Sequence, residues 1–315
     1  MAVGARPLVP SRLAPGGVVH GSSRTPTTKV GGYIALAKLR VVELLLITTV
    51  PVMVLAEKGW PSTKLVLLVL LGGTLAAGGA NAINMVVDRD IDALMKRTAG
   101  RPLVTGLISP RDALIYATVL EVVAFAVLWW GANLLSAVLT FGAMAFYVVV
   151  YTLWLKRTSK QNIVIGGAAG AVPVLVGWAA VQNNVAWPAV VLFIVMFLWT
   201  PPHFWALAIR HADEYRAAGV PMLPAVVPIA QAVRTMVLYT AALVAMTLVL
   251  IPVAHLGWIY SVAAVVCGGL FLWGTVDLGR NPTPQRSMRV FAYSITYVTV
   301  LFAAITVDVL VRYGW

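Results

Sequence analysis

The chain has 315 residues, of which 60% are hydrophobic and only 11% are charged, and its mean hydropathy is +0.89. Soluble domains average roughly 25% charged residues, so this composition excludes a soluble globular protein and predicts one that crosses a membrane several times. The net charge of +12 does not indicate nucleic-acid binding, because the basic residues lie in short loops between apolar segments. A single cysteine, Cys267, excludes a disulfide framework and a cysteine metal site.

Residues 1–29 are rich in Pro, Gly, Ser, Thr and Arg and have no apolar core of the signal-peptide type, so we expect a disordered cytoplasmic tail. Residues 30–315 are expected to form one membrane domain. It contains nine apolar segments, each near the ~20 residues that a membrane-spanning helix needs. The segments are 33–56, 63–83, 112–131, 133–154, 163–181, 187–209, 232–253, 257–275 and 289–311. The predicted fold class is therefore an all-α polytopic membrane protein with nine transmembrane helices.

Basic residues are distributed unevenly between the two sides of this predicted bundle. Of the 23 Lys and Arg residues, all but Lys58, Lys64 and Arg312 lie in the N-terminal region or in the loops after even-numbered segments. An excess of positive charge marks the cytoplasmic side of a membrane protein. We therefore expect the N-terminus and the working face in the cytoplasm and the C-terminus outside, in a multi-pass protein of the cell's inner or plasma membrane.

Asn84, Asp88 and Asp92 follow the second apolar segment at a spacing of four residues. At about 100° per residue they share one helix face, with the two carboxylates ~6 Å apart along the axis, while Asp90 points the other way. Such oxygen ligands suit Mg²⁺, which proteins bind through one or two carboxylates plus substrate phosphates. A solvated helix end is the alternative, but polar groups leaving a membrane helix are costly unless they bind something. With Asp88 at an aqueous mouth, Asp88→Ala should abolish turnover and leave the fold intact.

Basic residues near this motif favour the binding of a diphosphate, because Arg and Lys neutralise phosphate oxygens. Basic residues at helix ends also serve topology, so that alternative stays open for each of them. The candidates are Lys96, Arg97, Arg101, Lys156, Arg157 and Arg210. Asp213, in the loop after the sixth segment, is a candidate partner of the acidic motif. The residue four positions later is Ala217 rather than a second acid, so an ordinary capped loop remains an alternative there.

Five further side chains are weaker candidates. His203 lies in an apolar segment interrupted by two prolines, and it either contacts a substrate or an iron or bonds to a carbonyl that the prolines free. His211 and Tyr151 lie beside the charged candidates and are assigned to the same substrate pocket. Glu43 and Glu121 are carboxylates within membrane segments, where a functional role and a simple ion pair are both plausible. Glycine-rich runs at 72–79 and 166–171 predict close helix packing.

Together these features resemble the UbiA superfamily of intramembrane prenyltransferases, and within it the branch that farnesylates protohaem IX. The resemblance covers roughly residues 30–311. It rests on the segments 84–103 (NMVVDRDIDALMKRTAGRPL), 156–158 (KRT) leading into 166–167 (GG), 200–205 (TPPHFW) and 218–224 (AGVPMLP). Quinone-type relatives are expected to carry a second Asp-x3-Asp after the sixth helix. Ala217 departs from that pattern, in agreement with the haem branch, and a symmetric two-motif metal site is therefore not expected.

The resemblance implies a helical bundle around a central cavity and a transferase reaction, in which farnesyl diphosphate and haem b give haem O and diphosphate. It implies Mg²⁺ as cofactor, held by the catalytic residues Asn84, Asp88, Asp92 and Asp213. The implied partners are farnesyl diphosphate, haem b, the lipid bilayer and a downstream haem A synthase. An aromatic or quinone-precursor prenyltransferase is the alternative within the superfamily. A membrane haem transporter or chaperone is the alternative from another class, although transporters place polar groups near the bilayer midplane.

Overall fold

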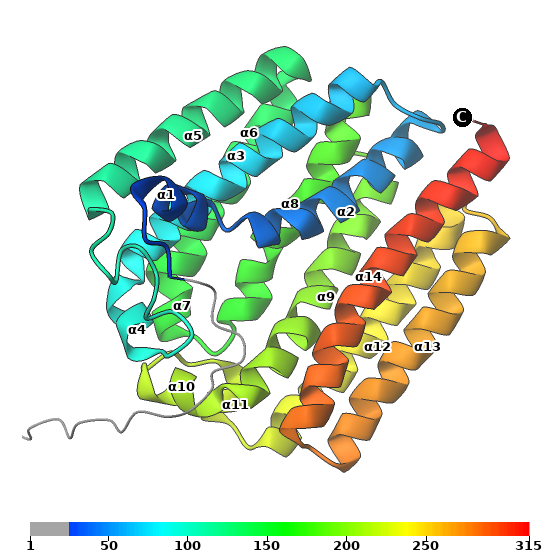
Figure 1. The fold of residues 1–315 in the computed structure, drawn as a ribbon. Helices are drawn as coiled ribbons and strands as arrows, with labels where there is room; N and C mark the ends of the chain where they lie inside the picture. The colour runs from blue at the N-terminus through cyan, green and yellow to red at the C-terminus, as the bar shows by residue number, and fades with distance from the viewer. Residues whose placement is uncertain (1–24, 315) are drawn as a thin grey trace, which may run out of the picture.

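The computed structural model describes the backbone of residues 25–314, and the side chains of these residues except 39–46. Most of the predicted tail, 1–24, and the side chain of Glu43 lie outside the described residues. The regular elements in the described chain are helices (Figure 1). They are α1 (Lys29–Ala37), α2 (Leu39–Glu57), α3 (Thr63–Val87), α4 (Arg89–Leu94), α5 (Pro110–Gly131), α6 (Leu134–Ala145), the π-helix η1 (Phe146–Leu155), α7 (Lys156–Thr158), α8 (Asn162–Gln182), α9 (Trp187–Arg210), α10 (Ala212–Ala217), α11 (Leu223–Val226), α12 (Ile229–Val253), α13 (Trp258–Arg280) and α14 (Pro284–Tyr313).

Eight helical stretches in the described chain are long and apolar enough to cross a membrane. They are α3, α5, the continuous stretch Leu134–Thr158, α8, α9, α12, α13 and α14. These stretches correspond to eight of the nine predicted segments, and the all-α polytopic prediction is confirmed. In the first predicted segment, 33–56, the described part includes the shorter apolar helical stretch Ile47–Glu57, and the helix is interrupted at Lys38. There the backbone is left-handed, with φ of 48° and ψ of 55°, and the segment is divided into α1 and α2.

Four of the short helices gather at one end of the bundle. Figure 1 shows α4, α7, α10 and α11 at its lower left, where α3 leads into α4 and α9 leads into α10. Helix α9 lies in the interior of this half of the bundle and packs against α8, α12 and α14. Its buried Trp199 and Trp205 belong to a large apolar core that also contains Tyr260, Phe271 and Tyr297. This packing brings the polar loops after the second and sixth predicted segments to the same end of the molecule.

Helices α3 and α5 approach each other closely because glycine lies at their interface. A Cβ atom on Gly79 would lie 3.0 Å from the Ala117 carbonyl oxygen and 2.7 Å from Glu121 Oε1. A Cβ atom on Gly72 would lie 2.5 Å from Leu128 Cγ. Small residues of this kind let the backbones of membrane helices pack at short range. The buried Glu121 carboxyl therefore lies in a helix–helix interface.

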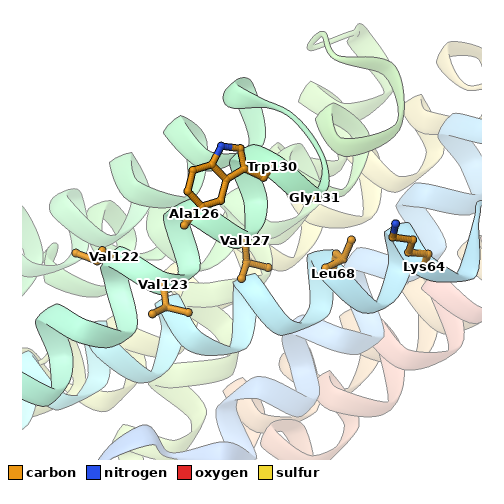
Figure 2. Close-up of a pocket in the computed structure, with 8 residues that line it drawn as sticks. All are labelled: Lys64, Leu68, Val122, Val123, Ala126, Val127, Trp130 and Gly131. Carbon is orange, nitrogen blue, oxygen red and sulfur yellow. The ribbon is translucent and has the colours of Figure 1, made fainter.

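A surface hollow of about 460 Å³ lies between α3 and α5 at the other end of the bundle (Figure 2). Its lining is apolar except for Lys64 and consists of Lys64, Leu68, Val122, Val123, Ala126, Val127, Trp130 and Gly131. Lys64 lies in the first turn of α3, whereas Asp88 directly follows the last residue of that helix. At 1.5 Å per residue the two are ~36 Å apart along the helix axis. The hollow is therefore not part of the predicted acidic site.

Gly79→Ala should lower the free energy of unfolding by about 1–3 kcal/mol, the usual cost of overpacking, because the new methyl group meets a backbone carbonyl. Gly142→Ala is the matched control, since Gly142 lies within α6 and a Cβ there meets nothing within 4 Å. The higher helix propensity of Ala should leave that variant as stable as the parent or more stable by up to about 1 kcal/mol. Thermal unfolding in detergent measures both. Equal stability of the two variants would contradict the close packing.

Candidate functional site

Asn84, Asp88 and Asp92 lie at the junction of α3 and α4. The helix assignment breaks at Asp88, yet the Asp88 amide donates to the Asn84 carbonyl at 2.9 Å and the Asp92 amide donates to the Asp88 carbonyl at 2.8 Å. The helical spacing therefore continues across the junction. The Asn84 side-chain amide also donates to Asp88 Oδ2 at 2.7 Å. The three residues are 3%, 0% and 4% exposed, so they form a buried acidic cluster rather than an open mouth.

Two basic residues from later segments neutralise the carboxylates of this acidic cluster. Lys156 donates to Asp88 Oδ2, and Arg101 donates to Asp92 Oδ2. The side chains of Lys156 and Arg101 are 17% and 19% exposed, so both pairs are largely shielded from water. Burying a charge is tolerated only when a partner compensates it. The structure thus brings together five of the predicted site residues, two carboxylates, one amide and two cations.

The π-helix η1 supplies further contacts to the acidic cluster. Thr152 Oγ1 accepts a hydrogen bond from the Asn84 amide at 3.3 Å and donates to the Tyr147 carbonyl, five residues earlier, at 2.9 Å. π-helical turns are frequent at functional sites. The Tyr147 and Tyr151 rings stack within η1 with centroids 5.3 Å apart. Tyr151 therefore lies next to the cluster, whereas Thr152 contacts it directly, and the sequence pattern did not predict Thr152.

Lys38 reaches the acidic cluster from the N-terminal side of the chain. Its Nζ atom donates to Asn84 Oδ1 at 3.3 Å. Lys38 lies at the junction of α1 and α2, outside the eight candidate spans. Burial, and after it two neighbouring cations, lower the pKa of its ammonium group, two carboxylates oppose this, and the resulting pKa is about 7. From the sequence, Lys38 was grouped with the basic residues that indicate the cytoplasmic side. The feature that could have pointed to a role in the site is the position of this lysine inside an apolar segment.

Asp90 faces away from the acidic cluster. Its carboxylate accepts two hydrogen bonds from Arg157, at 2.6 and 2.7 Å, and Arg157 also donates to the Val87 carbonyl at 2.9 Å. The hydrogen bond from Arg157 lowers the pKa of Asp90 to about 2. Arg157, predicted to bind a diphosphate, is therefore engaged on the outside of α4. Its pair with Asp90 is solvent-exposed, and such pairs contribute little to stability.

Asp213, the predicted fourth ligand, lies apart from the acidic cluster. Its side chain, in α10, is 97% exposed and accepts a hydrogen bond from Arg216 at 2.6 Å. The short helix presents this carboxylate to solvent, where an i, i+3 cation is its partner. Three predicted diphosphate ligands are also exposed, and their side chains form no hydrogen bond or ion pair within the part of the chain that the structure describes. They are Lys96, Arg97 and Arg210.

His203 is buried in the apolar core of the bundle. Its ring lies between Trp199 and Phe291, with centroid distances of 4.2 and 4.5 Å. His203 Nδ1 lies 2.6 Å from Ser294 Oγ, which itself donates to the Phe291 carbonyl at 2.6 Å. Since the serine proton is used there, Nδ1 carries a proton and donates it to Oγ, and Nε2 keeps its lone pair. The imidazole therefore bonds to a serine rather than to a freed carbonyl. His211 pairs instead with a neighbouring glutamate.

The acidic cluster retains carboxylate oxygens for a cation. Asp88 Oδ1 is buried and has no hydrogen-bond partner among the described residues. Such an atom costs free energy unless it meets a donor or a cation. Mg²⁺ is usually bound by one or two carboxylates with substrate phosphates and water completing its shell. No set of three His, Cys, Asp or Glu residues surrounds a metal position in the described chain. The donors thus fit Mg²⁺ that is shared with a phosphate.

The chain belongs to the UbiA prenyltransferase family, whose family model matches residues 45–302. It is similar to proteins named protoheme IX farnesyltransferase from two bacteria. The protein of Frankia alni is 54% identical over 286 residues, which is 90% of this chain and 99% of that protein. The protein of Streptomyces avermitilis is 50% identical over 290 residues, which is 90% of this chain and 95% of that protein. The family predicted from the sequence is confirmed.

Solved structures share the fold at low sequence identity. A structure described for digeranylgeranylglyceryl phosphate synthase superposes with a TM-score of 0.75 and 17% identity, and covers 90% of this chain and 99% of that chain. A UbiA homologue from Archaeoglobus fulgidus, bound to DMAPP and Mg²⁺, superposes with a TM-score of 0.58 and 19% identity, and covers 88% of this chain and 99% of that chain. At these identities the structures show a common fold.

Asp88→Ala should lower the free energy of unfolding by about 3–5 kcal/mol, because it leaves the ammonium of Lys156 unpaired in a buried site. This corrects the expectation, drawn from an aqueous mouth, that the fold would be unaffected. Adding Lys156→Met should recover much of the loss, since no lone charge then remains. Asp90→Ala, at an exposed pair, should cost less than about 1 kcal/mol. Thermal unfolding of the variants in detergent gives the comparison, and a fully stable Asp88→Ala protein would disprove the buried pair.

Proposed function

We propose that this protein transfers the farnesyl group of farnesyl diphosphate to a vinyl group of haem b, giving haem O and diphosphate. The observation that carries the proposal is about 50% identity, over nine tenths of the chain, to proteins named protoheme IX farnesyltransferase. The reaction breaks the bond between the farnesyl carbon and a diphosphate oxygen and forms a carbon–carbon bond to the vinyl group. Water supplies the new hydroxyl group and releases a proton. The reaction is one step in the synthesis of the cofactor of haem-copper oxidases.

The acidic cluster supports this reaction class through its mixed charge. We assign Asn84, Asp88 and Asp92 as the residues that hold Mg²⁺, which supplies Lewis-acid assistance to the departing diphosphate. The binding of Mg²⁺ in the Archaeoglobus fulgidus homologue is consistent with this assignment. Lys156 and Arg101 stabilise the negative charge that develops on the leaving group, because they are already fixed beside the cluster. Neither a covalent intermediate nor a strong base is needed for this step.

The remaining predicted residues are assigned roles outside the acidic cluster. The exposed cations near the cluster raise the local concentration of an anionic substrate before it binds. These cations are Lys96, Arg97 and Arg210, together with Arg157, whose side chain pairs with Asp90. His203, His211 and Tyr151 are assigned to the haem side of the substrate pocket. Of these, His203 has a ring nitrogen that is fixed as an acceptor, as the hydrogen bond to Ser294 indicates.

We infer the cellular placement from charge. The acidic cluster lies at the end of the bundle where most of the Lys and Arg residues occur, which favours a cytoplasmic active face in the plasma membrane. The N-terminus then lies in the cytoplasm and the C-terminus outside. A tail of residues 1–29 precedes one membrane domain, 30–315. Delivery of haem O to a downstream haem A synthase stays a prediction.

Purified protein supplied with Mg²⁺, farnesyl diphosphate and haem b should form haem O. Removal of the metal with EDTA should reduce the rate at least about 100-fold, because the diphosphate leaving group then loses its main charge stabilisation. Chromatography with mass detection measures the product. Replacing haem b with 4-hydroxybenzoate should give no prenylated product. Prenylation of 4-hydroxybenzoate without haem O would favour the aromatic prenyltransferase, and binding of haem without any transfer would favour the haem transporter or chaperone.

Asp88→Asn and Asp92→Asn should each lower kcat/KM for farnesyl diphosphate at least about 100-fold, because an amide of equal size cannot replace the anionic ligand. Asp90→Asn is the matched control on the outer face and should retain activity within about threefold. Asp213→Asn tests the predicted fourth ligand in the same assay. Activity near that of the parent would remove Asp213 from the site, whereas a loss like that of Asp88→Asn would place it at the metal.

A further inference from the structure

Lys38 adopts a backbone conformation that is unfavourable for lysine. Left-handed geometry costs a residue with a Cβ atom roughly 1–2 kcal/mol, whereas glycine adopts it freely. In the described chain, three other non-glycine residues have positive φ, namely Lys58, Asn183 and His255. Each of these lies at or just beyond the end of a helix that leads into a loop. Lys38 instead connects α1 directly to α2, and a strained lysine at a position that suits glycine favours a role for its side chain.

The packing of the junction aims the Lys38 side chain at the acidic cluster. A Cβ atom on Gly78 of α3 would lie 3.3 Å from Ala37 Cβ, so the absence of a side chain at Gly78 lets the α1–α2 junction lie directly on α3. At that approach the Lys38 ammonium comes within 3.3 Å of Asn84 Oδ1. An unbroken helix over the same residues would not have a left-handed position there. The helix break and the glycine therefore act together to place one ammonium group.

The charge balance at this position calls for an anion. Lys156 already pairs with Asp88 and Arg101 with Asp92, so each carboxylate of the acidic cluster has its own cation. Lys38 is the third cation, and its hydrogen bond goes to a neutral amide oxygen. It forms no ion pair with any residue that the structure describes. A partly buried cation without a counter-ion is costly, and a bound divalent cation would add to the excess of positive charge.

We propose that Lys38 binds the diphosphate group of the prenyl substrate, with its ammonium passing from the Asn84 amide oxygen to a phosphate oxygen. This rests on the proposed function, which supplies the diphosphate. This change of partner also frees Asn84 Oδ1, the side-chain oxygen of Asn84, to coordinate a metal ion. Lys38 is thus a substrate-binding residue that contacts the cluster at Asn84, whereas Lys156 contacts it at Asp88. A haem carboxylate is the other anion that the reaction offers, and the experiment separates the two.

The test uses Lys38→Gly, which suits the left-handed backbone and deletes the ammonium, and Lys38→Arg, which keeps the charge. Calorimetric titration of the purified proteins with inorganic diphosphate in Mg²⁺ should show binding weakened at least about tenfold in Lys38→Gly, the loss expected for one charge-assisted hydrogen bond. Lys38→Arg should stay within about threefold of the parent, because it retains the cation. Lys64→Met, at the far end of α3, is the matched control and should bind as the parent does.

Steady-state kinetics add a second readout. The KM for farnesyl diphosphate should rise in Lys38→Gly, and the KM for haem b should stay unchanged. Unaltered diphosphate binding in folded Lys38→Gly, or a rise confined to the KM for haem b, overturns the proposal. If Lys38→Gly does not fold, Lys38→Asn gives the same test, since Asn also tolerates left-handed geometry. A parent protein that binds inorganic diphosphate through Lys38 but forms no haem O refutes the proposed function and leaves the Lys38 assignment standing.

Discussion

The structure depends on the pairing of two buried carboxylates with two cations that arrive from other parts of the chain. Asp88 and Asp92 are enclosed at the end of a membrane helix, where an unpaired carboxylate would be prohibitively costly. Lys156 reaches Asp88 because η1 ends beside α3, and Arg101 reaches Asp92 because the loop after α4 folds back over it. The arrangement of these segments at one end of the bundle is therefore coupled to the satisfaction of two charges.

On the proposed function, the same pairing would prepare the buried site for a metal ion and a diphosphate. The pairs leave Asp88 Oδ1 without a partner, and both cations contact carboxylate oxygens that a metal ion would otherwise neutralise. A Mg²⁺ ion held by these carboxylates would supply the positive charge that Lys156 and Arg101 now provide, and the two side chains could then face phosphate oxygens. Binding would exchange partners among groups that are already shielded from water. Such preorganisation lowers the reorganisation cost of a reaction that releases an anion.

The sequence predicted those features that follow from local periodicity. Segment length located eight spans, and the four-residue spacing placed Asn84, Asp88 and Asp92 together with Asp90 turned outward. Features set by tertiary structure were not predictable. A lysine in left-handed geometry has no sequence signature, so the break at Lys38 was missed. The burial of the acidic cluster depends on how α1, η1 and the loop after α4 cover it, which no spacing within a single helix reports.

The exposed position of Asp213 affects how the charges are balanced in a site that has only one acidic motif. Quinone-type relatives are expected to carry a second acidic pair after the sixth helix, where this chain has Asp213 followed four residues later by Ala217. Since Asp213 pairs with Arg216 in solvent, that side of the site adds no buried carboxylate. A site with fewer acids holds less metal charge, so its own cations must neutralise more of the diphosphate. On the proposed assignment, a third cation at Lys38 would meet that requirement, so Ala217 in place of a second acid and a partly buried lysine at position 38 would be two aspects of a single charge balance.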